Sequence, residues 1–225
     1  MDAVLARLSS VEASEFCDAV KGVAAAAVKG AALRSRPVLG LVKVTVLPDG
    51  LRFEATDTYL AARVEWRPAG VSVPVLDWHA ARLFTAAELV DVLPPKSESK
   101  RPAGAAAGDV TTEVALFVGA DIGRVLRVTT SEAVREVAPV DDPGFPDVAQ
   151  FFDARQFDDR VSGEPRLYDP VRLGQVCKIV GAAGKGTFVD MMPGPSGLAP
   201  TTFVAAGGSV AVSVVLMPVK RKGVK

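Results

Sequence analysis

The sequence predicts an α+β fold in which a helix followed by antiparallel strands occurs three times. Two observations support this prediction. Apolar residues recur at helical spacing after three capping signals, and short apolar runs separated by turn residues follow each of them. The three copies cover residues 9–66, 71–147 and 167–219. Because each helix has a single apolar stripe, which must pack on its own strands, we expect sheets with the helices on one face.

The first copy begins with a capping box, in which Ser9 and Glu12 satisfy each other's free amides at the start of a helix. The apolar stripe of this helix consists of Phe16, Val20, Val23 and Ala27. We expect the helix to be broken at residues 34–37. Strands then follow at 38–46 and 51–66, because Pro48-Asp49-Gly50 is a hairpin signal between apolar runs. The second run is interrupted at 56–58.

The second and third helices also have clear start signals. Thr85 and Glu88 form another capping box, and Pro94 ends the helix that they open. Asp169 followed by Pro170 is an N-cap with proline at the first helical position. The stripe of this third helix is Leu173, Val176, Cys177 and Val180. Further strands are predicted at 71–76, 112–118, 124–137, 188–192, 201–205 and 210–219, and the low-complexity residues 96–109 are interpreted as a mobile loop.

Composition and charge exclude several classes of protein. The 26 Lys and Arg residues balance 26 Asp and Glu residues, so a uniformly basic nucleic-acid coat is excluded, although charges segregated onto one face are not. No apolar run approaches the roughly 18 residues of a membrane span. The 2 cysteines and 1 histidine provide no disulfide framework, zinc cluster or catalytic triad. We therefore expect no cofactor, no metal, no catalytic residue and a cytoplasmic location.

Several segments carry family-specific patterns, in order along almost the whole chain. They are a strand pair with an ATDG-like turn at 36–42 and 51–61, a helix at 84–93, an FPD signature at 144–148 and a tail similar to VVMPMR at 214–220. Together these segments resemble the bacterial DNA polymerase III β sliding clamp. The chain departs from that pattern at Thr58, where the family has glycine, and at residues 96–109, which are inserted.

The resemblance implies a closed ring around duplex DNA, with helices inside and sheets outside. It implies a processivity factor that tethers a polymerase without itself breaking a bond. Basic residues on the helices would face the phosphates without reading bases, and the candidates are Lys21, Lys29, Arg172 and Lys178. Glu88 and Asp91 on the second helix argue against a positive channel.

The resemblance also implies an apolar groove that accepts short peptides from DNA polymerases and other clamp-binding proteins. One wall would contain Thr56, Tyr59 and Leu60, an adjoining wall Pro146 and Phe151, and the other side Val215, Met217 and Pro218. Methionine and aromatic side chains suit a groove that accepts several ligands by repacking.

The three copies divide the chain into a complete clamp domain at 1–149 and a half-domain at 150–225. Known clamps have twelve such half-units around a ring, so four chains would complete one, joined head to tail under cyclic symmetry. A trimer is the alternative, with a degenerate fourth half-unit at 152–166. A clamp loader is a possible further partner, and the short chain suggests a phage-encoded version. The alternative function is a clamp-like protein or decoy that binds replication peptides without encircling DNA.

Overall fold

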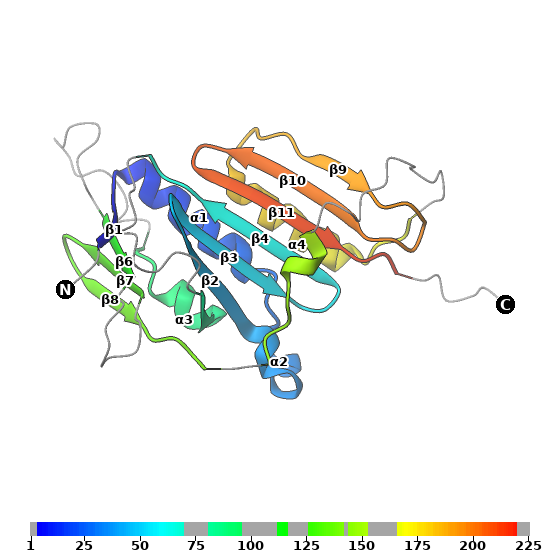
Figure 1. Ribbon diagram of the computed structural model, residues 1–225, viewed down its shortest axis with the longest axis horizontal. Helices are drawn as coiled ribbons and strands as arrows, with labels where there is room; N and C mark the ends of the chain where they lie inside the picture. Colours follow the sequence, from blue (N-terminus) through cyan, green and yellow to red (C-terminus); the bar gives the residue numbers. More distant parts are fainter. Residues whose placement is uncertain are drawn as a thin grey trace.

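The computed structural model describes residues 4–69, 81–95, 112–116, 126–141, 144–152 and 166–219. These residues form two antiparallel β-sheets with helices packed against them (Figure 1). The strands fall into three successive units, which we call units 1, 2 and 3. The class is therefore α+β, as predicted.

The elements of the three units follow one another along the chain. Unit 1 contains β1 (Val4–Leu8), α1 (Ser10–Ala24), α2 (Ala31–Ser35), η1 (Pro37–Gly40), β2 (Leu41–Leu47), β3 (Gly50–Thr56) and β4 (Leu60–Trp66). Unit 2 contains β5 (Ala81–Thr85), α3 (Ala86–Asp91), β6 (Thr112–Leu116), β7 (Leu126–Thr130) and β8 (Val134–Val137). A short helix, η3 (Ala149–Phe152), lies between units 2 and 3. Unit 3 contains α4 (Pro170–Val180), η5 (Gly181–Ala183), β9 (Asp190–Pro193), β10 (Thr201–Gly207) and β11 (Val210–Leu216).

The strand order shows how the units join. One sheet has the order β1-β6-β7-β8 and the other has the order β5-β2-β3-β4-β11-β10-β9. Units 1 and 2 therefore exchange their first strands, because β1 pairs with β6 and β5 pairs with β2. Units 1 and 3 join through their last strands, β4 and β11, which pair along their full length. The seven-stranded sheet thus continues from one unit into the next (Figure 1).

The main core lies between the helices and the sheets, with α1 at its centre. The ring of Phe16 lies 4.9 Å from that of Trp66 and 6.2 Å from that of Phe53, measured between centroids. All three side chains have no exposed surface. Gly22 lets α1 come close to η5, because a Cβ at this position would lie 2.8 Å from the Cβ of Ala182. Helix α1 therefore packs against both unit 1 and unit 3.

Most of the local predictions are confirmed. The Ser9–Glu12 capping box is complete, Thr85 caps α3, and Asp169 caps α4 with proline following it. The predicted hairpin joins β2 to β3. Phe16, Val20 and Val23 of the predicted stripe are buried on α1, and Ala27 is buried beyond the end of that helix. The predicted strand at 71–76 and the loop at 96–109 lie outside the described residues.

Three local predictions are wrong. The first helix ends at Ala24, ten residues before the expected break at 34–37, where the N–H groups of Ala25 and Ala26 donate to the carbonyl oxygens of Gly22 and Val23. The chain then turns at Gly30 (φ 65°) into the separate helix α2. Residues 38–40 belong to the 3-10 helix η1, so the strand begins only at Leu41. On α4 the buried residues are Val176, Ile179 and Val180, whereas Leu173 and Cys177 of the predicted stripe are exposed. The helix therefore packs on a face rotated away from the expected one.

Candidate partner-binding surface

A small apolar cluster lies on the face of the seven-stranded sheet opposite the helices. Ala61 of β4 and Val215 of β11 pair across the junction of units 1 and 3, and Val148 covers them. Three half-buried phenylalanines pack around this cluster: Phe145, Phe151 and Phe152. The segment that leads to η3 therefore crosses the sheet at the boundary between two units (Figure 1).

A buried ion pair holds this segment to the sheet. The carboxylate of Glu54, which is 3% exposed, accepts hydrogen bonds from the Nε and Nη2 atoms of Arg63 at 2.9 and 2.8 Å. The Arg63 guanidinium lies 4.5 Å from the centroid of the Phe152 ring, a distance suited to a cation–π contact. A buried carboxylate needs such a partner, because an unpaired charge in this place would carry a large desolvation cost.

The turn between β3 and β4 has a fixed shape that presents Tyr59 to solvent. The Oδ1 atom of Asp57 accepts hydrogen bonds from the backbone N–H groups of Tyr59 (2.9 Å) and Leu60 (2.8 Å). The Thr56 hydroxyl donates to the carbonyl oxygen of Leu60 and accepts from the N–H of Thr58. Thr58 has a φ of 80°, and the Tyr59 side chain is 51% exposed.

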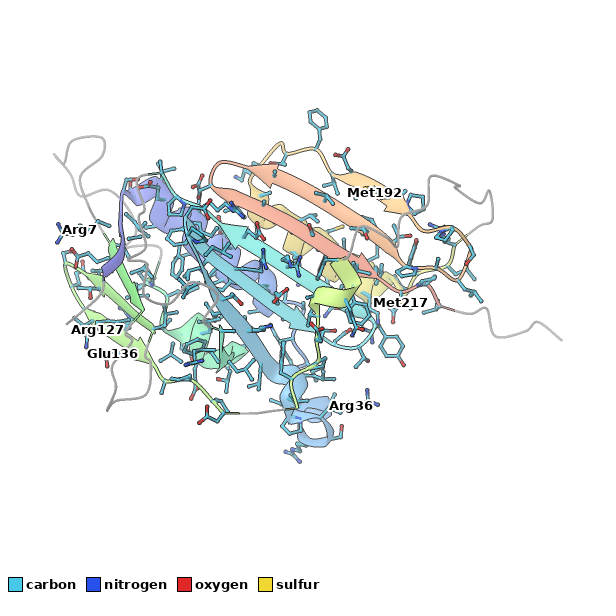
Figure 2. The ribbon with its side chains drawn as sticks, viewed as in Figure 1. Arg7, Arg36, Arg127, Glu136, Met192 and Met217 are labelled. Carbon is cyan, nitrogen blue, oxygen red and sulfur yellow. The ribbon has the colours of Figure 1, made fainter. Side chains whose placement is uncertain are left out.

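Neighbouring elements support this turn from two sides. On the helix side, Arg172 of α4 forms an ion pair with Asp57, and its guanidinium lies 4.3 Å from the centroid of the Tyr59 ring. On the other side, the backbone N–H of Met217 donates to the carbonyl oxygen of Tyr59 at 2.9 Å. Residues that are far apart in the sequence, at 57–59, 172 and 217, therefore meet around one turn (Figure 2 labels Met217).

The structure brings some of the predicted groove residues together and separates others. Tyr59 and Met217 meet at the turn, and Phe151 packs on the cluster that contains Val215. Pro218 is half-buried next to Met217, and Thr56 is buried within the turn. The side chain of Leu60 belongs to the main core, where it is 1% exposed. Pro146 lines a separate hollow on the same face, described next.

Two hollows adjoin this surface. One, of about 550 Å³, lies between β2, β5 and residues 140–141 and 145–147, and it is lined by Lys43, Leu83, Phe145, Pro146 and other residues. The other, of about 570 Å³, lies beside the β3–β4 turn and is lined by Lys29, Arg36, Tyr59, Arg172, Gln175 and other residues. Of the predicted groove residues, Pro146 lines the first hollow and Tyr59 the second. The other lining residues could not be predicted, because each hollow is formed by segments that are distant along the chain.

Of the basic residues predicted to face DNA, three are free on the surface and one is paired. Lys21 on α1 and Lys178 on α4 are exposed, and Lys29 is exposed in the link between α1 and α2. Arg172 is instead engaged with Asp57 and Tyr59. On α3, Glu88 and Asp91 are exposed.

Comparisons with known proteins identify this architecture. No protein-family model and no curated protein matches the sequence. Among solved structures, A. fulgidus PCNA bound to the C-terminal region of FEN-1 is similar over 99% of this chain and 100% of that chain, with a TM-score of 0.60 and 16% identity. The DNA polymerase III subunit β sliding clamp of Bartonella birtlesii is similar over 99% of this chain, with a TM-score of 0.58 and 14% identity. The fold is that of the DNA sliding clamps.

This chain spans the full length of the PCNA structure but only part of the length of the bacterial clamps. The chain spans 66% of the Bartonella clamp and 64% of a putative polymerase III β subunit from Eubacterium rectale, which is 10% identical with a TM-score of 0.59. The sequence resemblance to the bacterial clamps is therefore confirmed at the level of fold.

Three further properties of the described residues concern metal binding, thiol reactivity and membrane spans. No group of three or more His, Cys, Asp or Glu side chains in the described part of the chain could hold a metal ion. Burial raises the pKa of the Cys17 thiol to about 11, although the nearby charge of Lys21 lowers it, so this thiol is a poor nucleophile. None of the helices in the described ranges is long and apolar enough to cross a membrane.

Proposed function

We propose that the protein is a DNA sliding clamp, a non-enzymatic processivity factor that encircles duplex DNA and tethers replication proteins. The observation that carries this proposal is the match of the fold to sliding clamps over 99% of the chain. Two surfaces support it, because the helix side carries exposed lysines and the opposite side carries an apolar cluster bordered by Tyr59 and Met217. The site of action would be the cytoplasm, where replication takes place in bacteria.

The DNA surface would consist of the helices of units 1 and 3. Lys21, Lys29 and Lys178 would meet phosphates as mobile, solvated cations, which lets DNA slide because no base edge is read. Arg172 would contribute less directly, since Asp57 already neutralises its charge. The acidic α3 would weaken the attraction, so retention would depend on encirclement rather than on affinity.

The partner surface would be the groove around the β3–β4 turn. Tyr59, Met217 and Pro218 are at least partly exposed there, and Phe151 with Val215 forms the apolar floor beside them. A short peptide from a DNA polymerase or another clamp-binding protein would place its apolar side chains on this surface. Thr56, Leu60 and Pro146 would shape the surface from below and beside it. A clamp loader would use the same groove.

Peptide binding tests this groove directly. The probe is a fluorescent peptide covering the C-terminal end of the cognate replicative polymerase. The variants Met217→Glu and Tyr59→Ala should weaken its binding by about tenfold or more, as expected for central apolar contacts. Val134→Glu is the matched control, because Val134 is exposed (60%) and lies on β8, in the other sheet. Equal binding by all variants would remove the groove assignment.

Retention on DNA tests encirclement. Protein assembled on a nicked circular duplex should stay bound through gel filtration at high salt and be released when the circle is cut. Lys21→Glu combined with Lys178→Glu should weaken binding at low salt, where counterion release dominates. Release at the same rate from circular and linear DNA would contradict a closed ring.

A second candidate is a clamp-like protein that binds replication peptides without encircling DNA. The exposed Glu88 and Asp91 on α3 and the pairing of Arg172 favour this candidate, because both reduce the positive charge on the helix side. It predicts unchanged peptide binding together with no topological retention on circular DNA. The two experiments above therefore separate the two functions.

The ring itself is part of the first proposal. With three units in each chain, four chains would supply the twelve units of a clamp ring, and a trimer is the alternative. Light scattering on the purified protein measures the number of chains.

A further inference from the structure

The hollow beside the β3–β4 turn has three walls, and bonds join these walls to one another. Residues 27–39, which follow α1 and include α2, form the first wall, the β3–β4 turn forms the second, and α4 forms the third. The Nε2 atom of Gln175 donates to the carbonyl oxygen of Ala25 at the end of α1, and Arg172 forms an ion pair with Asp57 of the turn. Helix α4 is therefore tied to both other walls, so the hollow is formed before any ligand arrives.

The first wall is a closed loop. The backbone N–H of Val28 donates to the carbonyl oxygen of Leu39 at 2.8 Å, which joins the two ends of the loop. Leu33 of α2 lies over Gly40, where a Cβ would come within 2.2 Å of the Cδ1 atom of Leu33. Leu39 is buried, so the base of the loop is packed onto the protein. Compact surface loops of this kind have a defined shape and are often functional.

Two cations of this wall have uncompensated charges. Lys29 and Arg36 both line the hollow, and both are exposed. Neither forms an ion pair with any residue in the described part of the chain. Arg172 is already neutralised by Asp57 and by Asp169, the latter at 3.8 Å. Figure 2 shows Arg36 projecting from the ribbon beside α2. The hollow therefore attracts anions.

The size and the remaining lining of the hollow suit a single acidic side chain. Its volume of about 570 Å³ lies within the range of roughly 300–1,000 Å³ that is usual for sites of small ligands. Apolar surface comes from Ala27, Val28, Ala32 and Leu39. The carboxylate of an Asp or Glu side chain would meet the cations, and its carbon atoms would pack on this apolar surface.

Tyr59 borders both this hollow and the proposed peptide groove. Its side chain is 51% exposed and lines the hollow, and its carbonyl oxygen accepts a hydrogen bond from the N–H of Met217. A peptide that lies across Tyr59 and Met217 would therefore reach the hollow with a residue that flanks its apolar part. Duplex DNA fits less well, because its phosphates lie on a convex surface and would meet the carboxylate of Asp57 among the lining residues.

We propose that this hollow binds an acidic residue of the partner peptide, next to the apolar residues that occupy the groove. The inference rests on the proposed function and adds a charge preference to it. Lys29 and Arg36 bind the carboxylate, and Tyr59 separates the acidic position of the peptide from its apolar positions. Because both cations are exposed, salt should weaken this contribution.

Paired peptides test the charge preference. The probes are fluorescent peptides with the sequence of the C-terminal end of the cognate replicative polymerase, extended by a pair of Asp residues at one flank or at the other. In the partner of each probe, Asn replaces Asp. At low salt one acidic peptide should bind about two- to fivefold more tightly than its Asn partner, as expected for exposed ion pairs, and this preference should shrink at high salt. Equal affinities at low salt in both pairs would overturn the proposal.

Matched variants show whether Arg36 causes the preference. Arg36 is the residue of choice because Lys29 is also proposed to face DNA. Arg36→Glu should abolish or reverse the preference. Arg34→Glu is the control and should keep it, because Arg34 is exposed on α2 but does not line the hollow. An equal effect of the two variants would overturn the proposal. Weaker binding of Arg36→Glu to duplex DNA with an unchanged peptide preference would assign the hollow to DNA and overturn it as well.

The same peptides separate this inference from the proposed function. Met217→Glu should weaken the acidic peptide and its Asn partner alike, because it removes an apolar contact. If Met217→Glu weakens both peptides and the acidic preference is absent, the hollow has no such role and the groove stands. Binding of neither peptide to the unmodified protein would reject the groove and this inference together.

Crosslinking gives a second, independent measurement. A carbodiimide joins a carboxylate to an amine that is in contact with it. The acidic peptide, with its C-terminus amidated, should therefore become linked to Lys29, as measured by mass spectrometry, and the Asn peptide should not. Lys21 and Lys178 are internal controls, because they are exposed on α1 and α4 but do not line the hollow. Absence of a link at Lys29 would overturn the proposal.

Discussion

Replacing Thr58 with glycine should stabilise the protein. Thr58 has a φ of 80°, in the left-handed region that a β-branched residue avoids, and its side chain is exposed. Left-handed backbone costs an L-residue about 1–2 kcal/mol, and this cost disappears with glycine. Glycine loses about 0.5–1 kcal/mol through the greater entropy of the unfolded chain. The net gain in the free energy of unfolding is therefore about 0.5–1 kcal/mol.

Denaturant titration measures this gain as a higher midpoint with an unchanged slope. For a chain of this size the gain corresponds to a rise in Tm of roughly 1–4 °C. Thr58→Ala is the matched control, because alanine loses the branched side chain but keeps the Cβ that makes positive φ unfavourable. The alanine variant should gain little. If alanine stabilises as much as glycine, or if glycine lowers the midpoint, backbone strain at this turn is not the cause.

Two further substitutions test the packing and the charge network. Gly22→Ala should lower the free energy of unfolding by about 1–2 kcal/mol, because overpacking against Ala182 outweighs the gain in helix propensity. A higher denaturation midpoint would contradict the close approach of α1 to η5. Burial tends to raise the pKa of Glu65, but hydrogen bonds and charges from Arg52 and Arg67 outweigh it and hold the pKa below its usual value of 4.5. The stabilisation by Glu65 is therefore present above pH 4.5 and lost as the pH falls through the lowered pKa. Glu65→Gln should lower the free energy of unfolding at pH 7 and reduce the loss of stability that acid causes. An unchanged dependence of stability on pH would exclude this role.

Local signals explain why so much of the fold could be predicted from the sequence. The caps at Ser9, Thr85 and Asp169 depend on side chains only three or fewer residues away, so they are visible in a short window. The hairpin before Gly50 has the same local origin, because Leu47 pairs directly with Gly50 and leaves a two-residue turn of Pro48 and Asp49. Such features follow from backbone chemistry alone and need no knowledge of the tertiary structure.

The remaining features depend on contacts between distant segments. The exchange of β1 and β5 between units, and the junction of β4 with β11, are choices among strands with similar apolar patterns. Arg172 has the pattern of a solvated helix residue, and only the folded chain brings it to Asp57. The exposed side of α4 could not be predicted either, because a stripe shows which residues can be buried but not whether a neighbour is present to bury them.

The antiparallel junction of β4 and β11 has a consequence for how units 1 and 3 come apart. Seven residue pairs, from Leu60–Leu216 to Trp66–Val210, join the two strands. Because the backbone hydrogen bonds of such a ladder are lost together, the two units should open as one cooperative body and not as two hinged domains.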